Sequence, residues 1–187
     1  MIIGITGKSG SGKSFLSEIL AKELDFIHID IDKISHQILE MKKTKQFLFK
    51  EFGSSVFTND KINRKILGNI VFNNSNKLEK LNKFCQTEME NKLDEIINTS
   101  KKSLILDYAL LCGLKQFNKC DIKILLKTDL DVRFSRVTAR EHISKEYFIS
   151  RDNSLEDFDE SLFDIVYNNI SNTDINQLTQ KFKSNLI

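Results

Sequence analysis

The fold of this chain is decided by the octapeptide Gly7-Lys8-Ser9-Gly10-Ser11-Gly12-Lys13-Ser14. Its spacing is G-x-x-x-x-G-K-[ST], in which glycines let the backbone amides come close to an anion. An apolar run at residues 1–6 precedes the octapeptide, and a helical pattern at residues 15–24 follows it. A strand, a loop and a helix N-terminus are therefore expected to converge on one phosphate group.

Two side chains at the end of this loop carry the expected chemistry. Lys13 is predicted to reach the β and γ phosphates of a nucleotide, and the Ser14 hydroxyl is predicted to ligate Mg²⁺. The alternative is a glycine-rich turn with a chance lysine, but the strand and helix signals on either side favour a nucleotide site.

Composition limits what else the chain can be. Its 187 residues are 40% hydrophobic and 29% charged, which is typical of one globular core. The net charge of +2 gives no basic excess for a nucleic-acid partner, and no membrane span or basic leader is visible. Cys85, Cys112 and Cys120 form no C-x-x-C pair, which favours buried thiols in a reducing compartment. We expect a cytoplasmic protein with no obligatory protein partner.

Short apolar runs alternate with helical stretches, which predicts an α/β fold with a mainly parallel sheet covered on both faces. The five expected strands are residues 1–6, 26–29, 103–107, 122–127 and 165–167. Residues 33–100 are rich in helix formers and far exceed one crossover helix, so they are expected to form an inserted helical substrate domain. Residues 133–155 are expected to form a helical lid with Ser144 as a possible helix N-cap. The core would comprise residues 1–32, 101–132 and 156–187.

Acidic residues stand at two predicted strand ends. Asp30 and Asp32 follow the second strand, and their spacing of two predicts both carboxylates on one side of an extended segment. Asp32 is the candidate base for an attacking hydroxyl, and Asp30 would help to hold the substrate or the water shell of the metal. A helix N-cap is the alternative role for Asp32. Asp107 ends the third strand, where a second acidic residue for Mg²⁺ or its water is usual, although a turn residue is an alternative.

Arginines recur at helical spacing in the expected lid. Arg133, Arg136 and Arg140 are three and four residues apart, which predicts one helix face. Such a cluster could stabilise a phosphoryl group in transfer, and a solvated face is the alternative. His28 is predicted on a strand and His36 and His142 on helices, and none of them has metal-ligand spacing.

Taken in order, these residues resemble the dephospho-coenzyme A kinase family. The resemblance rests on the glycine loop, on Ile29-Asp30-Ile31-Asp32, on Phe52-Gly53, on Asn63-Arg64-Lys65-Ile66-Leu67 and on Ile70-Val71-Phe72, and it continues through Asp107, Arg136, Arg140 and Arg151. It implies a P-loop three-layer sandwich and ATP-dependent phosphorylation of the ribose 3′-hydroxyl of dephospho-coenzyme A. The implied catalytic residues are Asp32, Lys13 and Arg140. The implied ATP-binding residues are Gly10, Ser11, Gly12, Lys13, Ser14, Phe15, Arg136 and Asn169, and the implied substrate-binding residues are Asp30, Arg64 and Asp107.

Three other classes stay open at this point. Gln86 and Gly113 stand where the family has a His and a Glu, which would suit a non-catalytic nucleotide-binding relative. A P-loop kinase for a nucleoside, nucleotide or sugar would share the same loop, carboxylates and lid. Asn118-Lys119-Cys120-Asp121 fits a guanine-reading N-K-x-D pattern, but it precedes a predicted strand and the chain has no D-x-x-G.

Overall fold

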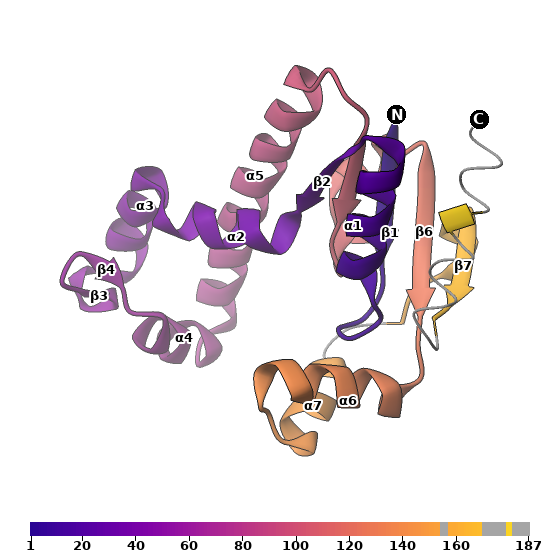
Figure 1. Cartoon of the computed structure of the whole chain (residues 1–187). Helices are drawn as coiled ribbons and strands as arrows, with labels where there is room; N and C mark the ends of the chain where they lie inside the picture. The colour runs from indigo at the N-terminus through magenta and orange to yellow at the C-terminus, as the bar shows by residue number, and fades with distance from the viewer. Residues whose placement is uncertain (154–156, 170–178, 181–187) are drawn as a thin grey trace. The chain divides into compact units, whose positions relative to one another are not determined.

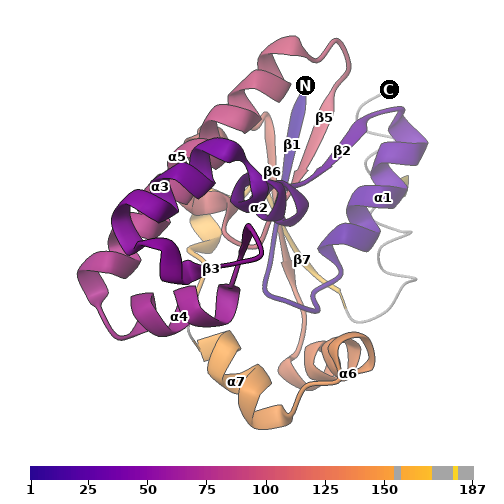
Figure 2. The same cartoon turned by 90° about the vertical axis from the view of Figure 1, so that its left-hand side faces the viewer.

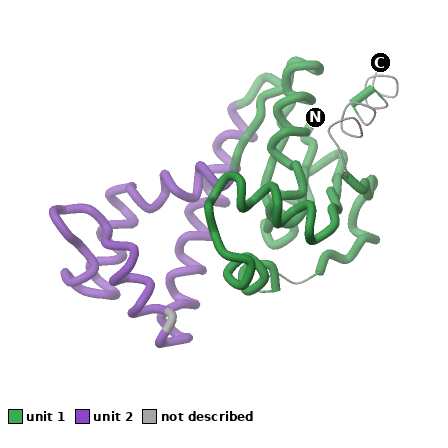
Figure 3. Tube along the Cα trace, turned by 60° about the horizontal axis from the view of Figure 1, so that its bottom comes forward, with its two compact units in different colours: residues 1–30, 100–187 green, residues 31–99 purple. Residues whose placement is uncertain are grey.

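The computed structural model describes residues 1–153, 157–169 and 179–180 of the chain. Two compact units are distinguished in Figure 3. Met1–Asp30 and Ser100–Ile187 form the first unit, and Ile31–Thr99 form the second.

The expected segment boundaries can be compared with these units. The second unit starts two residues before the expected insertion, residues 33–100, and ends one residue before it. The expected core segment 156–187 lies largely outside the described residues. The expected lid, residues 133–155, is described except for its last two residues. The substrate-binding role of the second unit stays a prediction.

The first unit is built on a parallel five-stranded sheet, as predicted, with strand order β2-β5-β1-β6-β7. Its strands are β1 Ile2–Thr6, β2 Ile27–Asp30, β5 Leu104–Asp107, β6 Ile122–Lys127 and β7 Ile165–Asn168. Every residue of β5 is buried, which is why its sequence is continuously apolar up to the terminal aspartate. Because all five strands are parallel, their carboxyl ends meet at one edge of the sheet.

Helix α1, Lys13–Leu24, packs on this sheet through an apolar stripe. Leu16 and Leu20 are fully buried in one cluster with Ile3, Ile5 and Ile124. Burying each such side chain contributes about 1.5–3 kcal/mol, so the helix that follows the glycine loop is firmly held to the strand that precedes it.

The remaining elements of the first unit lie in its second half. They are the short helices η2 Leu111–Gly113, η3 Lys115–Lys119 and η4 Glu160–Leu162 and the helices α6 Leu130–Glu141 and α7 Lys145–Asn153. Figures 1 and 2 both show α6 and α7 beyond the carboxyl ends of β1 and β6. The Ser144 hydroxyl accepts a hydrogen bond from the Tyr147 amide at 3.2 Å, which confirms the predicted N-cap.

The second unit is helical with one small hairpin. Its helices are α2 Ile31–Glu40, α3 Lys42–Phe52, η1 Ser54–Val56, α4 Arg64–Phe72 and α5 Ser75–Thr99, and β3 Phe57–Thr58 pairs antiparallel with β4 Lys61–Ile62. Leu48, Val56 and Leu67 are buried in its own apolar cluster. Within the described residues, no helix combines the length and the apolar character that crossing a membrane requires.

One local prediction was wrong. The segment Asp30-Ile31-Asp32 is not extended, because β2 ends at Asp30 and α2 begins at Ile31. Ile31, the first residue of the helix, is fully buried. The backbone changes from strand to helix between Asp30 and Asp32, so a spacing of two does not align their carboxylates. Asp32 occupies the first turn of α2, where a negative charge suits the helix dipole.

Candidate active site

The glycine loop joins β1 directly to α1, which confirms the predicted strand-loop-helix context. Gly10 and Gly12 have φ of 81° and 96°, which side chains with a Cβ rarely adopt, and Gly12 is the N-cap of α1. The helix starts at Lys13, two residues earlier than the sequence pattern predicted. The helix N-terminus is therefore part of the loop itself, which is the geometry of an anion site.

The carbonyl groups of this loop are bound by donors from the protein. The Lys8 carbonyl accepts from the Ser11 amide at 3.1 Å, and the Gly12 carbonyl accepts from the Leu16 amide at 3.0 Å. The Gly10 carbonyl accepts from Arg136 Nη1 at 3.2 Å. Because these carbonyls are bound to donors of the protein, the other side of the loop, which carries the amides, is the side that suits a phosphate.

Asn169 braces the same loop from the end of β7. Its Nδ2 donates to the Ser11 carbonyl at 2.7 Å, and the Asn169 amide donates to the Lys127 carbonyl at 2.7 Å. Asn169 is 1% exposed, and so is Ser11. These side chains therefore shape the loop from within, and any contact of Ser11 with a nucleotide would be made by its backbone.

The first turn of α1 presents the remaining predicted nucleotide residues. Lys13 Nζ lies 3.5 Å from the Lys8 carbonyl, so the lysine side chain is folded back over its own loop. Ser14 and Phe15 are exposed on this turn. A hydroxyl and an aromatic ring at a helix N-terminus are suited to contact a bound phosphate and its cation, or a neighbouring base.

Acidic residues gather at the same sheet edge as the loop. Asp30 is in register with Asp107, and Asp107 is in register with Ile5 of β1. His28 Nε2 lies 3.3 Å from Asp107 Oδ2, and Asp107 is only 3% exposed. His28 was not predicted to be part of the site. The signal that could have indicated His28 was that β2 and β5 both end in aspartate. When these two strands pair in register, His28 of β2 comes close to Asp107 at the end of β5.

The three arginines of α6 do not share one environment. Arg136 binds the loop carbonyl of Gly10. Arg140 is 63% exposed at its side chain and is paired with Glu141, which also accepts from Arg151 at 2.7 Å. Arg133, to which the resemblance assigned no role, is the buried one and is paired with Asp152.

Two predicted residues belong to the second unit. Asp32 is exposed on the first turn of α2. Arg64 is exposed at the first position of α4, directly after Asn63, whose side chain caps the helix by accepting from the Ile66 amide at 3.1 Å. Their catalytic and substrate-binding roles stay predictions.

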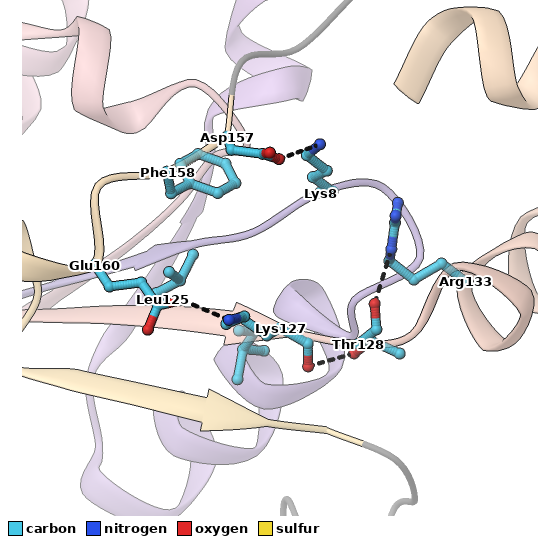
Figure 4. A pocket seen from close by; sticks show the side chains of 9 residues that line it. Lys8, Leu125, Lys127, Thr128, Arg133, Asp157, Phe158 and Glu160 are labelled. Carbon is cyan, nitrogen blue, oxygen red and sulfur yellow. Dashed lines mark hydrogen bonds and ion pairs between the residues drawn. The ribbon is translucent and has the colours of Figure 1, made fainter. Parts of the chain in front are cut away.

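A pocket of about 340 Å³ lies beside the loop in the first unit. Figure 4 shows Lys8 and Arg133 on its loop side and Phe158 on its wall. Lys8 Nζ is 2.9 Å from Asp157 Oδ1, and the Thr128 hydroxyl donates to the Asn169 carbonyl at 2.8 Å. The lining of this pocket beside the loop therefore contains charged and hydrogen-bonded side chains.

The guanine-reading alternative is excluded by position. Asp121 Oδ2 accepts from the Ile2 amide at 2.7 Å, at the start of β1. The glycine loop follows the opposite end of that strand. A base-reading aspartate has to lie on the nucleotide side of the sheet.

Comparison with known proteins agrees with this geometry. The family model described as dephospho-CoA kinase matches residues 1–174. A dephospho-CoA kinase of Fusobacterium nucleatum is 37% identical over 150 residues, which cover 78% of this chain and 76% of the relative. A dephospho-CoA kinase of Oceanobacillus iheyensis is 31% identical over 157 residues, which cover 81% of this chain and 78% of the relative. The solved dephospho-CoA kinase from Campylobacter jejuni is 26% identical with a TM-score of 0.70 and covers 99% of this chain and 96% of its own. The structure of TT1252 from Thermus thermophilus, 24% identical, covers 100% and 98% with a TM-score of 0.83 and shares the fold.

Proposed function

The chain belongs to the dephospho-CoA kinase family, and on that premise we propose that it transfers the γ-phosphoryl group of ATP to the ribose 3′-hydroxyl of dephospho-CoA. This is the last step of coenzyme A synthesis. The observation that carries the proposal is the family match over residues 1–174, because it spans the second unit as well as the phosphate loop. The loop alone is common to many kinases and would leave the acceptor open.

We assign the donor site to the loop and the first turn of α1. Backbone amides from Gly10 to Lys13 bind the β-phosphate, and Lys13 moves from the Lys8 carbonyl to the phosphates. The 3.5 Å distance between Lys13 Nζ and that carbonyl supports this role, because it puts the ammonium group at the loop. Arg136 and Asn169 act on ATP through the loop carbonyls that they hold. Phe15 is exposed on the same turn and flanks the base.

We assign the acceptor chemistry to acidic residues. Ionised Asp32 accepts the proton of the ribose hydroxyl while the hydroxyl oxygen attacks the γ-phosphorus and ADP leaves. Asp30 orients the acceptor from the end of β2, and Arg64 attracts its phosphates at the start of α4. The exposure of Asp32 and Arg64 supports these roles, since both must reach a ligand.

The oxygen donors of the site fit Mg²⁺. Ser14 on α1 and Asp107 at the end of β5 would hold the ion or its water, since Mg²⁺ usually takes only one or two protein oxygens together with substrate phosphates. Among the described residues no group of three or more His, Cys, Asp and Glu side chains could hold a metal. When bound, the ion neutralises charge on the β and γ phosphates.

The predicted lid acts through Arg140. In the present arrangement Arg140 is paired with Glu141 on the surface. Surface pairs of this kind contribute about 0–1 kcal/mol, so a triphosphate can compete for the guanidinium at small cost. Closure of α6 and α7 would then exclude water from the transferring group.

We place this activity in the cytoplasm with small-molecule partners only. Three thiols, Cys85, Cys112 and Cys120, are free, which supports a reducing compartment. Burial raises the pKa of the Cys120 thiol to about 12, so it is protonated and inert at neutral pH.

A coupled ADP-release assay with ATP and Mg²⁺ tests the function. Dephospho-CoA is offered beside a panel of nucleosides, nucleotides and sugars, with Lys13→Ala as the matched inactive control. We expect turnover with dephospho-CoA alone, and its loss in Lys13→Ala. Turnover of another acceptor, or nucleotide binding without any turnover, would refute the assignment in favour of a different kinase or a non-catalytic relative.

A further inference from the structure

Arg133 is held on every edge of its guanidinium group. Its Nη1 and Nη2 both donate to the carboxylate of Asp152, with the Nη2 to Oδ2 distance at 2.9 Å. Its Nε donates to the Thr128 carbonyl at 3.0 Å, and its Cζ lies 5.7 Å from the centre of the Phe148 ring. Arg133 is 6% exposed and Asp152 is 7% exposed. This is a bidentate ion pair, the most directional geometry available to these groups.

The backbone of the same residue touches the phosphate loop. A Cβ placed on Gly10 would lie 2.7 Å from the Arg133 carbonyl oxygen and 2.9 Å from its Cα. One turn further along α6, Arg136 donates to the Gly10 carbonyl. The start of α6 is therefore in direct contact with Gly10 of the phosphate loop.

A third charge connects Asp152 to the loop. Lys8 Nζ lies 4.0 Å from Asp152 Oδ2 and 2.9 Å from Asp157 Oδ1. Asp152 belongs to α7, Arg133 to α6 and Lys8 to the loop, so one buried carboxylate faces cations from both other segments. Hydrogen bonds from Arg133 hold the pKa of Asp152 below its usual value, which keeps the carboxylate ionised.

Stability alone does not account for such a pair. Desolvating two charges offsets most of their attraction, and apolar replacements of buried ion pairs are often neutral or stabilising. What the pair supplies is direction, because a fork of two hydrogen bonds fixes the orientation of both side chains.

We propose that Arg133 and Asp152 are positioning residues of the phosphate loop. The pair fixes the first turn of α6 against Gly10 and so holds the loop in the conformation that binds the nucleotide. The proposal rests on the phosphotransfer function proposed above, but it concerns the nucleotide step alone. Neither residue is assigned a contact with the reacting atoms, so both act through the loop.

The experiment compares Asp152→Asn, Arg133→Gln and the double variant with Asp131→Asn. Asp131 is 89% exposed at its side chain on the same helix α6, so its variant removes an equal charge without touching the loop. ADP binding is measured by calorimetry without any acceptor, and the KM for ATP and kcat are measured by the coupled assay. Circular dichroism and thermal melting select the variants that are folded at the assay temperature.

We expect ADP affinity to fall about 10-fold or more in each single variant and to be unchanged in Asp131→Asn, since sub-ångström errors in a phosphate site are costly. The KM for ATP should rise more than kcat falls. The double variant should be no worse than the poorer single variant, because the two residues act as one unit. The double variant also leaves neither Arg133 nor Asp152 as an unpaired buried charge. It can therefore be measured in place of a single variant that does not fold.

Folded variants whose ADP affinity stays within twofold of the wild type would overturn the proposal, even if their melting temperature falls. A purely structural pair would give that pattern. The test uses ADP alone, so it gives its answer even if dephospho-CoA proves not to be the acceptor.

Discussion

The close approach of α6 to the phosphate loop makes Gly10→Ala the sharpest single test of the site. Gly10 has φ of 81°, and its missing Cβ would meet the Arg133 carbonyl oxygen at 2.7 Å. Real Cβ atoms essentially never come within 3.0 Å of such an atom, and ordinary contact begins at 3.4 Å. Because the obstacle is backbone, rotating a side chain cannot relieve it.

The size of the effect follows from two terms. The positive φ costs an alanine about 1–2 kcal/mol in the folded state. Relieving the contact requires the loop and α6 to separate by roughly 0.7 Å, which is the difference between 2.7 Å and ordinary contact. A displacement of about 1 Å in a reactive site can cost about 100-fold, so we expect kcat/KM for ATP to fall by about 100-fold, equivalent to about 2.7 kcal/mol.

Gly53→Ala is the matched control. Gly53 has φ of 82°, but a Cβ there would meet no atom within 4 Å. Both variants therefore place an alanine at a positive φ, and only Gly10→Ala carries the contact. Thermal melting reports the backbone cost in each variant, while ADP calorimetry and the KM for ATP report the contact. Equal nucleotide affinity in the two variants would refute the claim that α6 is packed against the loop at Gly10.

Three further predictions test the remaining assignments. Asp32→Asn should reduce kcat by about 100-fold or more with ADP affinity kept, as expected for loss of a general base, and a near-normal kcat would remove Asp32 from that role. Arg64→Ala should raise the KM for dephospho-CoA about 10-fold and leave the KM for ATP unchanged, and the reverse pattern would misplace the acceptor site. Arg133 lowers the pKa of Asp152 in the folded state. The stability that ionised Asp152 contributes is therefore fully present at pH values above the pKa of the unfolded chain, about 3.9, and is lost as the pH falls through the folded-state pKa. The stability difference between wild type and Asp152→Asn, measured by urea unfolding, should be constant from about pH 5 to 7 and shrink below about pH 4; a constant difference down to pH 2 would contradict this.

The sheet could be predicted because its signal is local. The three central strands β1, β5 and β6 are short apolar runs with most side chains buried, and β5 shows this directly with Leu104, Ile105 and Leu106 all buried. The glycine loop was equally readable, since its conformation depends on residues without a Cβ at fixed spacing. Strand order could not be predicted in the same way, because it depends on contacts between runs that are far apart in the sequence, such as β1 and β5.

The prediction for Asp30 and Asp32 failed for a different reason. A spacing of two aligns side chains only if the backbone remains extended, and the apolar Ile31 between them begins a helix instead. His28 was missed because its contact with Asp107 depends on the register of β2 against β5. Neither result could be derived from the spacing of residues along the chain.

The arginines of α6 illustrate the limit most clearly. Helical spacing predicts which residues share a face, but it does not predict how deep each one lies, and Arg133 is buried while Arg140 is exposed. Depth is set by what approaches the helix, here the loop at Gly10 and the carboxylate of Asp152. In this phosphate loop the Lys8 and Gly12 carbonyls accept from amides of the loop and of α1, but the Gly10 and Ser11 carbonyls need donors from elsewhere. Arg136 and Asn169 supply these donors from two later segments, so the motif of eight residues encodes only part of the site that it marks.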